Sequence, residues 1–388
     1  MKLGRQFDPR RNALNAWRLT LATGVILLHS FSLTGRHLSS APIHQFLRDA
    51  WVDGFFAISG FLITSSWLSN PRLRSYFAAR GLRILPGLWV CLIITAFVVA
   101  PLGVAIQGGS AARLLLSHAP IEYVLKNSAV LTLQNDVGGT PRGIPFPLIW
   151  NGSLWTLIWE MLCYIAVAVL GIVGLLNRRW FIPAAFALAV TWSALLPTWV
   201  WSLLEEPVGT PRQIEAAHNP DTAALLMEVI AARFAVMFLA GALLYQLRNL
   251  IPARWSLVAL SAAIALASML LPNYRLVGAI PLAYAIIVSG ALIRNKRVRL
   301  RTDLSYGVYI YAFPIQQLLV ICGLGTMPPI LFAIVATCAT LPVAAISWFL
   351  VEKPAMSLKS RLKRRSTAPA GDPETGRAVP REGAENSA

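Results

Sequence analysis

Residues 84–104 read ILPGLWVCLIITAFVVAPLGV, an apolar run without a charged side chain. A helix of about 20 such residues spans the roughly 30 Å of hydrocarbon in a bilayer. Similar runs recur along the chain, and we interpret each as a membrane-spanning helix. The ten predicted spans are residues 15–33, 50–68, 84–104, 153–176, 181–203, 225–247, 256–272, 276–293, 305–323 and 329–350. The sequence therefore predicts an all-α, polytopic transmembrane helix bundle.

The composition of the whole chain agrees with this prediction. Hydrophobic residues make up 56% of its 388 residues and charged residues only 13%, whereas soluble domains are about a quarter charged. These figures exclude several soluble domains in series, a collagen-like chain and a disordered chain. The four cysteines all lie in apolar runs, with neither disulfide nor zinc spacing, and we expect no metal site.

The net charge of +17 predicts an orientation in the membrane. Without a soluble basic domain that could dock on nucleic acid, the positive-inside rule is the better explanation. An N-terminus in the cytoplasm assigns 25 Lys and Arg to cytoplasmic segments and seven to external ones. We therefore expect both termini in the cytoplasm, with a short segment at 1–14, a transmembrane domain at 15–356 and a tail at 357–388. Within this tail, the Pro-, Glu- and Gly-rich residues 366–388 are predicted to be disordered.

Two polar residues in the first span suggest a functional site. Arg18 and His29 are eleven positions apart, which is about three helical turns, so they share one face of the helix. A charged residue inside a span is costly and is a candidate for function. The structural alternative is that Arg18 extends to the headgroups and His29 marks the outer boundary of the span.

A carboxylate in the fourth span is expected at a similar depth. This span enters from outside, so Glu160 lies about 10 Å below the external surface, close to the depth of His29. A carboxylate and an imidazole at one depth could form a general acid–base pair. The alternative is a polar contact that only holds two helices together.

Other charged and small residues indicate a functional site less specifically. Asp53 begins a run in which Gly54, Ser59 and Gly60 permit close backbone approach, either to a helix or to a ligand. Arg80 and Arg83 lie side by side at the cytoplasmic end of the third span. Paired guanidinium groups suit phosphates, although for an Arg-x-x-Arg pair taken alone positive-inside anchoring is the favoured explanation. For Arg233 we expect a buried structural pair with Glu228.

Six motifs in this order resemble the acyltransferase-3 family of bacterial membrane-bound sugar O-acyltransferases. They are Arg18-x10-His29, Asp53-Gly54-Phe55-Phe56 running to Ser59-Gly60-Phe61-Leu62, Arg80-x-x-Arg83, Asn151-Gly152-Ser153-Leu154-Trp155-Thr156-Leu157 with Glu160, Ser305-Tyr306-Gly307-Val308-Tyr309-Ile310-Tyr311 and Val351-Glu352-Lys353-Pro354. The resemblance covers about residues 12–356. It departs at Ala312, where many relatives have histidine, and at Thr156 and Ile158, where serines are common.

The resemblance implies an enzyme of the bacterial inner membrane that takes an acyl group, usually acetyl, from cytoplasmic acyl-CoA. The acceptor would be a hydroxyl of an envelope or secreted glycan or glycolipid, and acyl-CoA would be a cosubstrate rather than a tightly bound cofactor. It also implies that Arg18 and His29 are essential and that Arg80 and Arg83 bind the donor. We take Glu160 as a further catalytic candidate. Within the same motifs, Asp53, Ser59, Trp155 and Tyr309 are candidates for substrate binding.

These residues suggest a mechanism and one rival. His29 would be the general base, Glu160 would orient it, and Arg18, Arg80 and Arg83 would bind donor phosphates. His29 lies toward the outer side and the arginines toward the inner side, so either the donor arm threads inward or an acyl-enzyme relays the group. Because no obvious Ser or Cys nucleophile lies beside His29, we favour direct threading. The rival is a transporter or flippase in which Arg18, His29 and Glu160 form a proton or substrate path.

Overall fold

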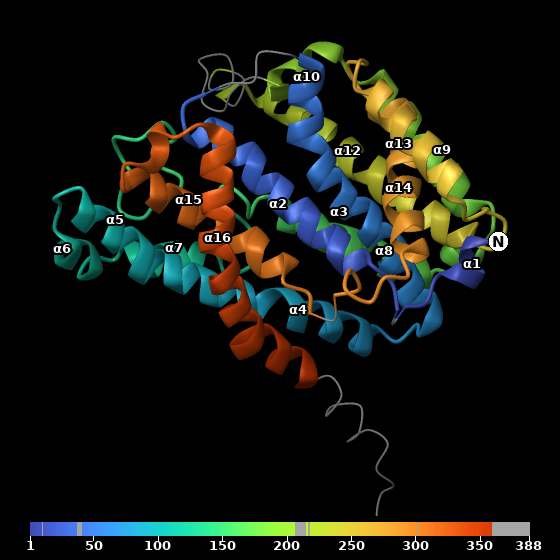
Figure 1. The fold of residues 1–388 in the computed structure, drawn as a ribbon, viewed down its shortest axis with the longest axis horizontal. Helices are drawn as coiled ribbons and strands as arrows, with labels where there is room; N and C mark the ends of the chain where they lie inside the picture. The colour runs from blue at the N-terminus through green and yellow to red at the C-terminus, as the bar shows by residue number, and fades with distance from the viewer. Residues whose placement is uncertain (10, 37–40, 206–214, 216–217, 301, 359–388) are drawn as a thin grey trace, which may run out of the picture.

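The computed structural model describes the whole chain except residues 10, 37–40, 206–214, 216–217, 301 and 359–388. The predicted disordered tail at 366–388 lies outside the described residues. The described residues form a bundle of α-helices (Figure 1), together with short 3-10 and π-helical turns and two isolated β-bridges. The fold is therefore all-α, as the apolar pattern predicts.

Six helical segments of the described chain are long and apolar enough to cross a membrane. They are α2 (Leu14–Leu33), α3 (Ala41–Ser69), α4 (Leu73–Ile94) with η1 (Thr95–Val99) and α5 (Ala100–Ile106), α12 (Pro220–Gln246), α14 (Arg275–Leu292), and α16 (Pro329–Ser347) with η4 (Trp348–Glu352). Four shorter apolar helices are α8 (Thr156–Ile172), α9 (Phe181–Leu195), α13 (Trp255–Ser268) and α15 (Ser305–Ile321). Each of the ten predicted ranges overlaps one of these segments.

The helix boundaries differ from the predicted ranges in understandable ways. The third segment begins at Leu73 rather than at 84, because the arginines of its first turns continue the helix beyond the apolar run. The ninth segment, α15, ends near Ile321, and the left-handed Gly323 that follows, with φ of 89°, turns the chain. Glycine adopts this conformation without the steric cost of a side chain.

Small residues bring α3 and α12 into close contact. A Cβ atom added at Gly60 would lie 1.9 Å from the carbonyl oxygen of Phe238, and one added at Gly241 would lie 1.9 Å from that of Ala57. The two backbones can approach this closely only because both positions are glycine, which is the usual means of helix packing in membranes. This contact holds α3 against α12, and four side chains of α3 line the cavity of the candidate active site.

The segment 105–152, which the charge pattern predicts to be external, contains two short helices, α6 (Ala111–Leu115) and α7 (Ala119–Asn127). Both lie beside α5 at one end of the molecule in Figure 1, and α7 also packs along α4. Tyr123 of α7 is buried, while Ile121 and Leu125 are exposed. The exposed apolar side chains agree with the prediction that residues 121–133 lie on or in the membrane surface, which stays a prediction.

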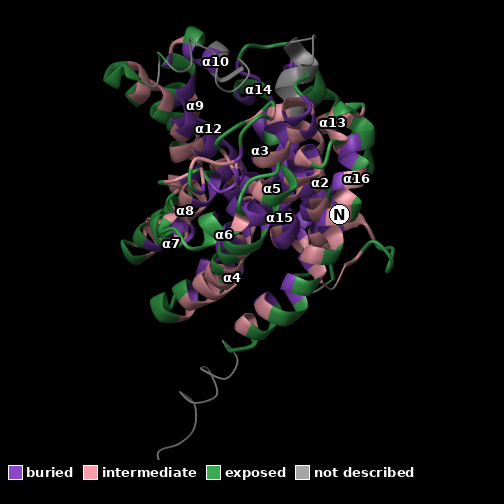
Figure 2. Ribbon diagram, turned by 90° about the vertical axis from the view of Figure 1, so that its left-hand side faces the viewer, coloured by how far each residue is buried: buried purple, intermediate pink, exposed green. Residues whose placement is uncertain are grey.

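Burial divides the bundle into an interior and a periphery. Figure 2 shows buried positions concentrated where α2, α3 and α15 run, with exposed positions on outer segments such as α7 and α13. Many exposed side chains are large and apolar, including Leu102, Leu162 and Leu266. Such an apolar exterior is expected of a protein whose helices contact lipid rather than water.

Candidate active site

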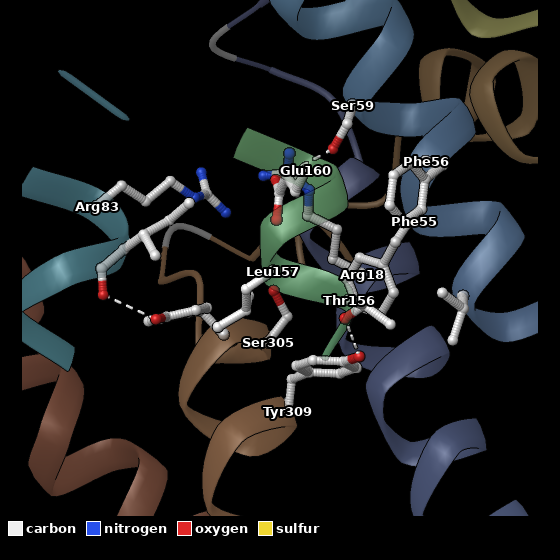
Figure 3. A pocket seen from close by; sticks show the side chains of 13 residues that line it. Arg18, Phe55, Phe56, Ser59, Arg83, Thr156, Leu157, Glu160, Ser305 and Tyr309 are labelled. Atoms are coloured by element: carbon white, nitrogen blue, oxygen red, sulfur yellow. Dashed lines mark hydrogen bonds between the residues drawn. The ribbon is translucent and has the colours of Figure 1, made fainter. Parts of the chain in front are cut away.

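A cavity opens between five helices, α2, α3, α4, α8 and α15 (Figure 3). Its lining residues are Arg18, Val52, Phe55, Phe56, Ser59, Arg83, Ile84, Thr156, Leu157, Glu160, Ser305, Tyr306 and Tyr309. Five of the residues singled out in the sequence analysis line it together: Arg18, Ser59, Arg83, Glu160 and Tyr309. A mostly apolar pocket with a few converging polar groups is the usual form of a small-molecule site.

Two arginines enter this cavity from different helices and share one carboxylate. Asp303, which lies in the loop before α15, accepts a hydrogen bond on Oδ2 from Arg18 Nη1 at 3.1 Å and from Arg83 Nη2 at 2.6 Å. Its Oδ1 accepts a third hydrogen bond from the Ser305 hydroxyl at 2.5 Å. The side chains of Arg18 and Asp303 are each 11% exposed, and that of Arg83 is 31% exposed.

The ion pairs determine the charge of Asp303. Burial alone would raise the pKa of this carboxyl, but the guanidinium groups of Arg83 and Arg18 favour the charged form more strongly and lower the pKa to about 2. Asp303 is therefore a carboxylate at every physiological pH. It neutralises part of the positive charge that the two arginines bring to the cavity.

Glu160 is held by two hydroxyl groups. Ser59 of α3 donates a weak hydrogen bond to Glu160 Oε1 at 3.5 Å, and the Tyr164 hydroxyl donates a shorter one to the same oxygen. Figure 3 shows the side chains of Arg18, Arg83 and Glu160 converging on one region of the cavity. A carboxylate next to guanidinium groups is a suitable partner for a polar substrate group or a proton.

Arg80 lies beside this region but does not line the cavity. Its guanidinium carbon is 4.8 Å from the centre of the Tyr76 ring and 5.5 Å from that of Tyr164. Its Nε atom is buried and has no hydrogen-bond partner among the described residues. The structure therefore separates the two arginines of the Arg-x-x-Arg motif, with Arg83 in the cavity and Arg80 packed on aromatic rings.

The remaining wall of the cavity combines aromatic and hydroxyl groups. Tyr309 and Thr156 share a hydrogen bond of 2.5 Å between their hydroxyls, and the Tyr309 ring packs edge-on against Phe55. Phe56 and Leu157 complete the apolar part. The Thr156 hydroxyl also donates to the Ser153 carbonyl oxygen at 3.3 Å, so the Tyr309 hydroxyl is the donor to Thr156.

His29 lies away from this cavity. It is three turns beyond Arg18 on α2, and its ring packs edge-on against Phe313 with ring centres 4.9 Å apart. Its Nδ1 atom is buried without a hydrogen-bond partner in the described residues. The neighbouring Ser30 accepts a hydrogen bond from Gln316 Nε2 at 3.0 Å. The structure therefore does not bring His29 and Glu160 together.

Asp53 belongs to a second, closed group of charges. Asp49 and Asp53 of α3 pair with Arg233 of α12 and Arg275 of α14, at distances of 2.6 to 2.9 Å. The Asp53 side chain is fully buried and also accepts a hydrogen bond from the Tyr274 hydroxyl. Asp53 does not line the cavity, so its assignment to substrate binding stays a prediction.

Two further expectations differ from what the structure contains. Arg233 pairs with Asp49 and Asp53 rather than with Glu228, which is exposed, so the expected pair within α12 was wrong. Trp155 is 39% exposed, lies near Phe234 at 5.8 Å between ring centres, and is not among the cavity residues. In the described part of the chain, no group of three His, Cys, Asp or Glu could hold a metal ion.

Comparison with known proteins now identifies the family. The sequence profile described as an acyltransferase domain, that of the acyltransferase-3 family, matches residues 11–349. The chain belongs to the acyltransferase-3 family. It is therefore an acyltransferase of a membrane family, and the transporter alternative loses its basis.

Two relatives cover almost the whole chain. Nodulation protein 10 of Rhizobium leguminosarum bv. viciae is 28% identical over 371 residues, which is 92% of this chain and 96% of that protein. The O-acetyl transferase of Shigella phage Sf6 is 28% identical over 348 residues, covering 89% of this chain and 96% of the relative. No solved structure matches the chain.

The sequence analysis missed one residue of the site, Asp303. Its signal in the sequence was available, because Asp303 is the one acidic residue between 293 and 304, where Arg294, Lys296, Arg297, Arg299 and Arg301 also occur. An isolated acid among basic residues next to a span is a candidate for pairing with an arginine inside the span. The sequence does not tell which arginine it would pair with.

Proposed function

We propose that this protein is a membrane-bound O-acyltransferase that moves an acyl group, acetyl by preference, from cytoplasmic acyl-CoA to a hydroxyl of an envelope or secreted glycan. The support is family membership together with the relative named as an O-acetyl transferase. The charge distribution supports ten spans with both termini in the cytoplasm of a bacterial inner membrane.

The observation that carries this proposal is the meeting of Arg18, Arg83 and Glu160 in one cavity. Arg83 directly precedes the apolar run of its helix, on the side where the N-terminal residues and the basic loops are expected, which is the side of acyl-CoA. Guanidinium groups with unused N–H donors bind phosphate or a polarised thioester carbonyl. We propose that Arg18 and Arg83 bind the donor in the cavity and that Arg80 contributes from its edge.

The reaction requires a base for the acceptor. As the hydroxyl oxygen bonds to the thioester carbonyl carbon, its proton goes to the base, the carbon–sulfur bond breaks, and the CoA thiolate leaves and is protonated. We propose His29 as the base, since its unpaired Nδ1 is available for a proton. Glu160 would stabilise charge in the cavity, and Ser59 and Tyr309 would contact the substrate.

The separation of His29 from the cavity favours threading of the donor. An acyl-pantetheine arm is long and narrow, so it could enter at Arg83 and Arg18 and extend along α2 toward His29. The acceptor would then approach from the external side, where the segment 105–152 lies. Asp53 and Trp155, which do not line the cavity, would act on substrate only through the position of α3 and α8.

The test measures base-labile O-acetyl groups on envelope glycans from cells with wild-type protein, His29→Ala or no protein, at matched protein levels. We expect acetyl only with the wild type. Equal acetyl with His29→Ala would keep the transferase and reject this base. Acetyl at the same level in cells without the protein would reject the acceptor class. A stable acyl-enzyme in kinetic experiments would reject direct threading.

A further inference from the structure

Asp303 is the carboxylate that both cavity arginines bind. Arg18 comes from α2 and Arg83 from α4, and 65 positions separate them in the sequence. Both donate to the same atom, Asp303 Oδ2. Of the ion pairs among the described residues, those to Asp303 are the only ones that either arginine forms.

The Asp303 carboxylate binds the two arginines from outside the cavity rather than from within it. Asp303 is 8% exposed and is not a lining residue, whereas Arg18, Arg83 and Ser305 are. Its other oxygen is bonded to the Ser305 hydroxyl, which fixes it at the start of α15. A ligand in the cavity therefore does not have to displace Asp303 in order to reach the guanidinium groups.

Each guanidinium keeps free donors on the cavity side. A guanidinium group has five N–H donors, and the hydrogen bonds to Asp303 use one from Arg18 Nη1 and one from Arg83 Nη2. Within the described chain, neither side chain has another hydrogen-bond partner. The remaining donors form a paired cationic surface for an anion.

Without Asp303, the pair would not keep this geometry. Two guanidinium groups this close in a partly buried site repel each other, and among the described residues only Asp303 lies within ion-pair distance of either one. Glu160, the other acid of the cavity, accepts its hydrogen bonds from Ser59 and Tyr164 instead. Asp303 is thus the group that offsets the repulsion and sets the direction of both side chains.

We propose that Asp303 is a positioning residue that holds Arg18 and Arg83 in the arrangement that receives the phosphate groups of the acyl donor. The inference rests on the proposed function, because it takes a CoA thioester as the donor. It adds a residue outside the cavity to the machinery and gives it a role that acts through the arginines. Asp303 would then affect only the phosphorylated part of the donor.

The test compares two ligands of the full-length protein in detergent or nanodiscs. CoA carries a 3′-phospho-ADP group that pantetheine lacks, so the ratio of their Kd values isolates recognition of this phosphorylated nucleotide. We expect Asp303→Asn to raise the Kd of CoA about tenfold, as expected for loss of a close charge pair, and to leave the Kd of pantetheine unchanged. Asp303→Glu, which keeps the charge but displaces it, should also weaken CoA binding. The exposed Asp221 provides the matched control, Asp221→Asn, which should bind both ligands like wild type.

A double-mutant cycle separates positioning from general stability. If Asp303 acts through Arg83, then Asp303→Asn should weaken CoA binding in the wild-type background and have little further effect in an Arg83→Gln background. With acetyl-CoA as substrate, the same variant should raise KM for acetyl-CoA more than it lowers kcat. With S-acetylpantetheine it should change neither.

Three results would overturn the inference. Equal weakening of CoA and pantetheine would mean that Asp303 only supports the fold. Tighter CoA binding by Asp303→Asn would mean that the carboxylate competes with the phosphates instead of orienting their partners. If wild-type protein did not bind CoA at all, the proposed donor itself would be wrong, and the positioning role would be rejected with it.

Discussion

Two groups of buried charges in this molecule differ in whether they are open to a cavity. In the first, Arg18 and Arg83 share Asp303 and turn their remaining donors toward a cavity. In the second, Arg233 and Arg275 each pair with both Asp49 and Asp53, and the group is sealed between α3, α12 and α14. The first group lines a cavity that also contains Glu160. The second group does not line the cavity, and Asp49 there also pairs with Arg48.

The difference suggests separate roles, in which the open group is available to a ligand and the sealed group stabilises the fold. Charges inside a membrane-spanning bundle are costly, so each needs a reason to be present. In the sealed group, the acids and arginines pair with one another and tie three helices together. In the open group, both arginines line the cavity, and each uses only one N–H donor on Asp303. A ligand with negative charge or strong acceptors would complete it.

The largest expected effect is loss of the folded protein when the sealed group is broken. Asp53→Leu leaves Arg233 and Arg275 with half of their acidic partners, and removing one member of a buried ion pair costs about 3–5 kcal/mol. We expect a much lower yield of monodisperse protein and a lower Tm than for Asp221→Asn. A variant of normal stability that has lost acyl transfer would show instead that Asp53 acts on the substrate.

The second effect is loss of activity without loss of the fold. Glu160→Gln keeps an oxygen that accepts hydrogen bonds from Ser59 and Tyr164, but it removes the cavity's own negative charge. We expect acyl transfer to fall about 100-fold, the usual range for loss of a proton-transfer or charge-stabilising group, with Tm close to that of wild type. Transfer within a factor of two of wild type would remove Glu160 from the mechanism.

The third effect distinguishes the two arginines of the Arg-x-x-Arg motif. Arg80 packs over Tyr76 and Tyr164 and does not line the cavity, whereas Arg83 does. We expect Arg80→Gln to raise KM for the acyl donor only about threefold, in line with a contact at the edge of a site. Arg83→Gln should raise it much more. Equal effects of the two variants would contradict the division that the structure makes.

The smallest effect concerns pH. The pKa of Asp303 is lowered to about 2 from an ordinary value of 3.8. A lowered carboxyl pKa means that the stabilisation is fully present above the ordinary value and is lost as the pH falls through the lowered one. The difference in Tm between wild type and Asp303→Asn should therefore be constant above about pH 5 and shrink toward pH 2. A difference that changes between pH 6 and pH 8 would contradict this assignment.

The sequence predicted the fold better than the site, for a physical reason. The length and apolarity of a span are local properties, so each of the ten predicted ranges overlaps an apolar helix. Partners of buried charges are not local. Arg18 and Asp303 are 285 positions apart, and Arg233 and Asp53 are 180 apart. The choice of Glu228 as the partner of Arg233 failed because it relied on neighbours in one helix.

Some of the predicted site residues meet in the structure, and others do not. The sequence grouped Arg18 with Arg83 as donor-binding residues, and both line the same cavity. His29 was placed at the depth of Glu160, but depth along a helix does not determine which neighbour a side chain faces. In the structure its neighbour is Phe313 of α15. Only the packing of α2 against α15 determines that contact.

The most direct test of the account is transfer of labelled acetyl from acetyl-CoA to envelope glycan by purified protein. Wild type, Arg83→Gln and Asp221→Asn would be compared at equal amounts of folded protein and subsaturating donor. We predict label in the glycan with wild type and Asp221→Asn, and its near loss with Arg83→Gln, restored in part by more donor. Equal labelling by all three proteins would contradict the claim that the open group of charges binds the acyl donor.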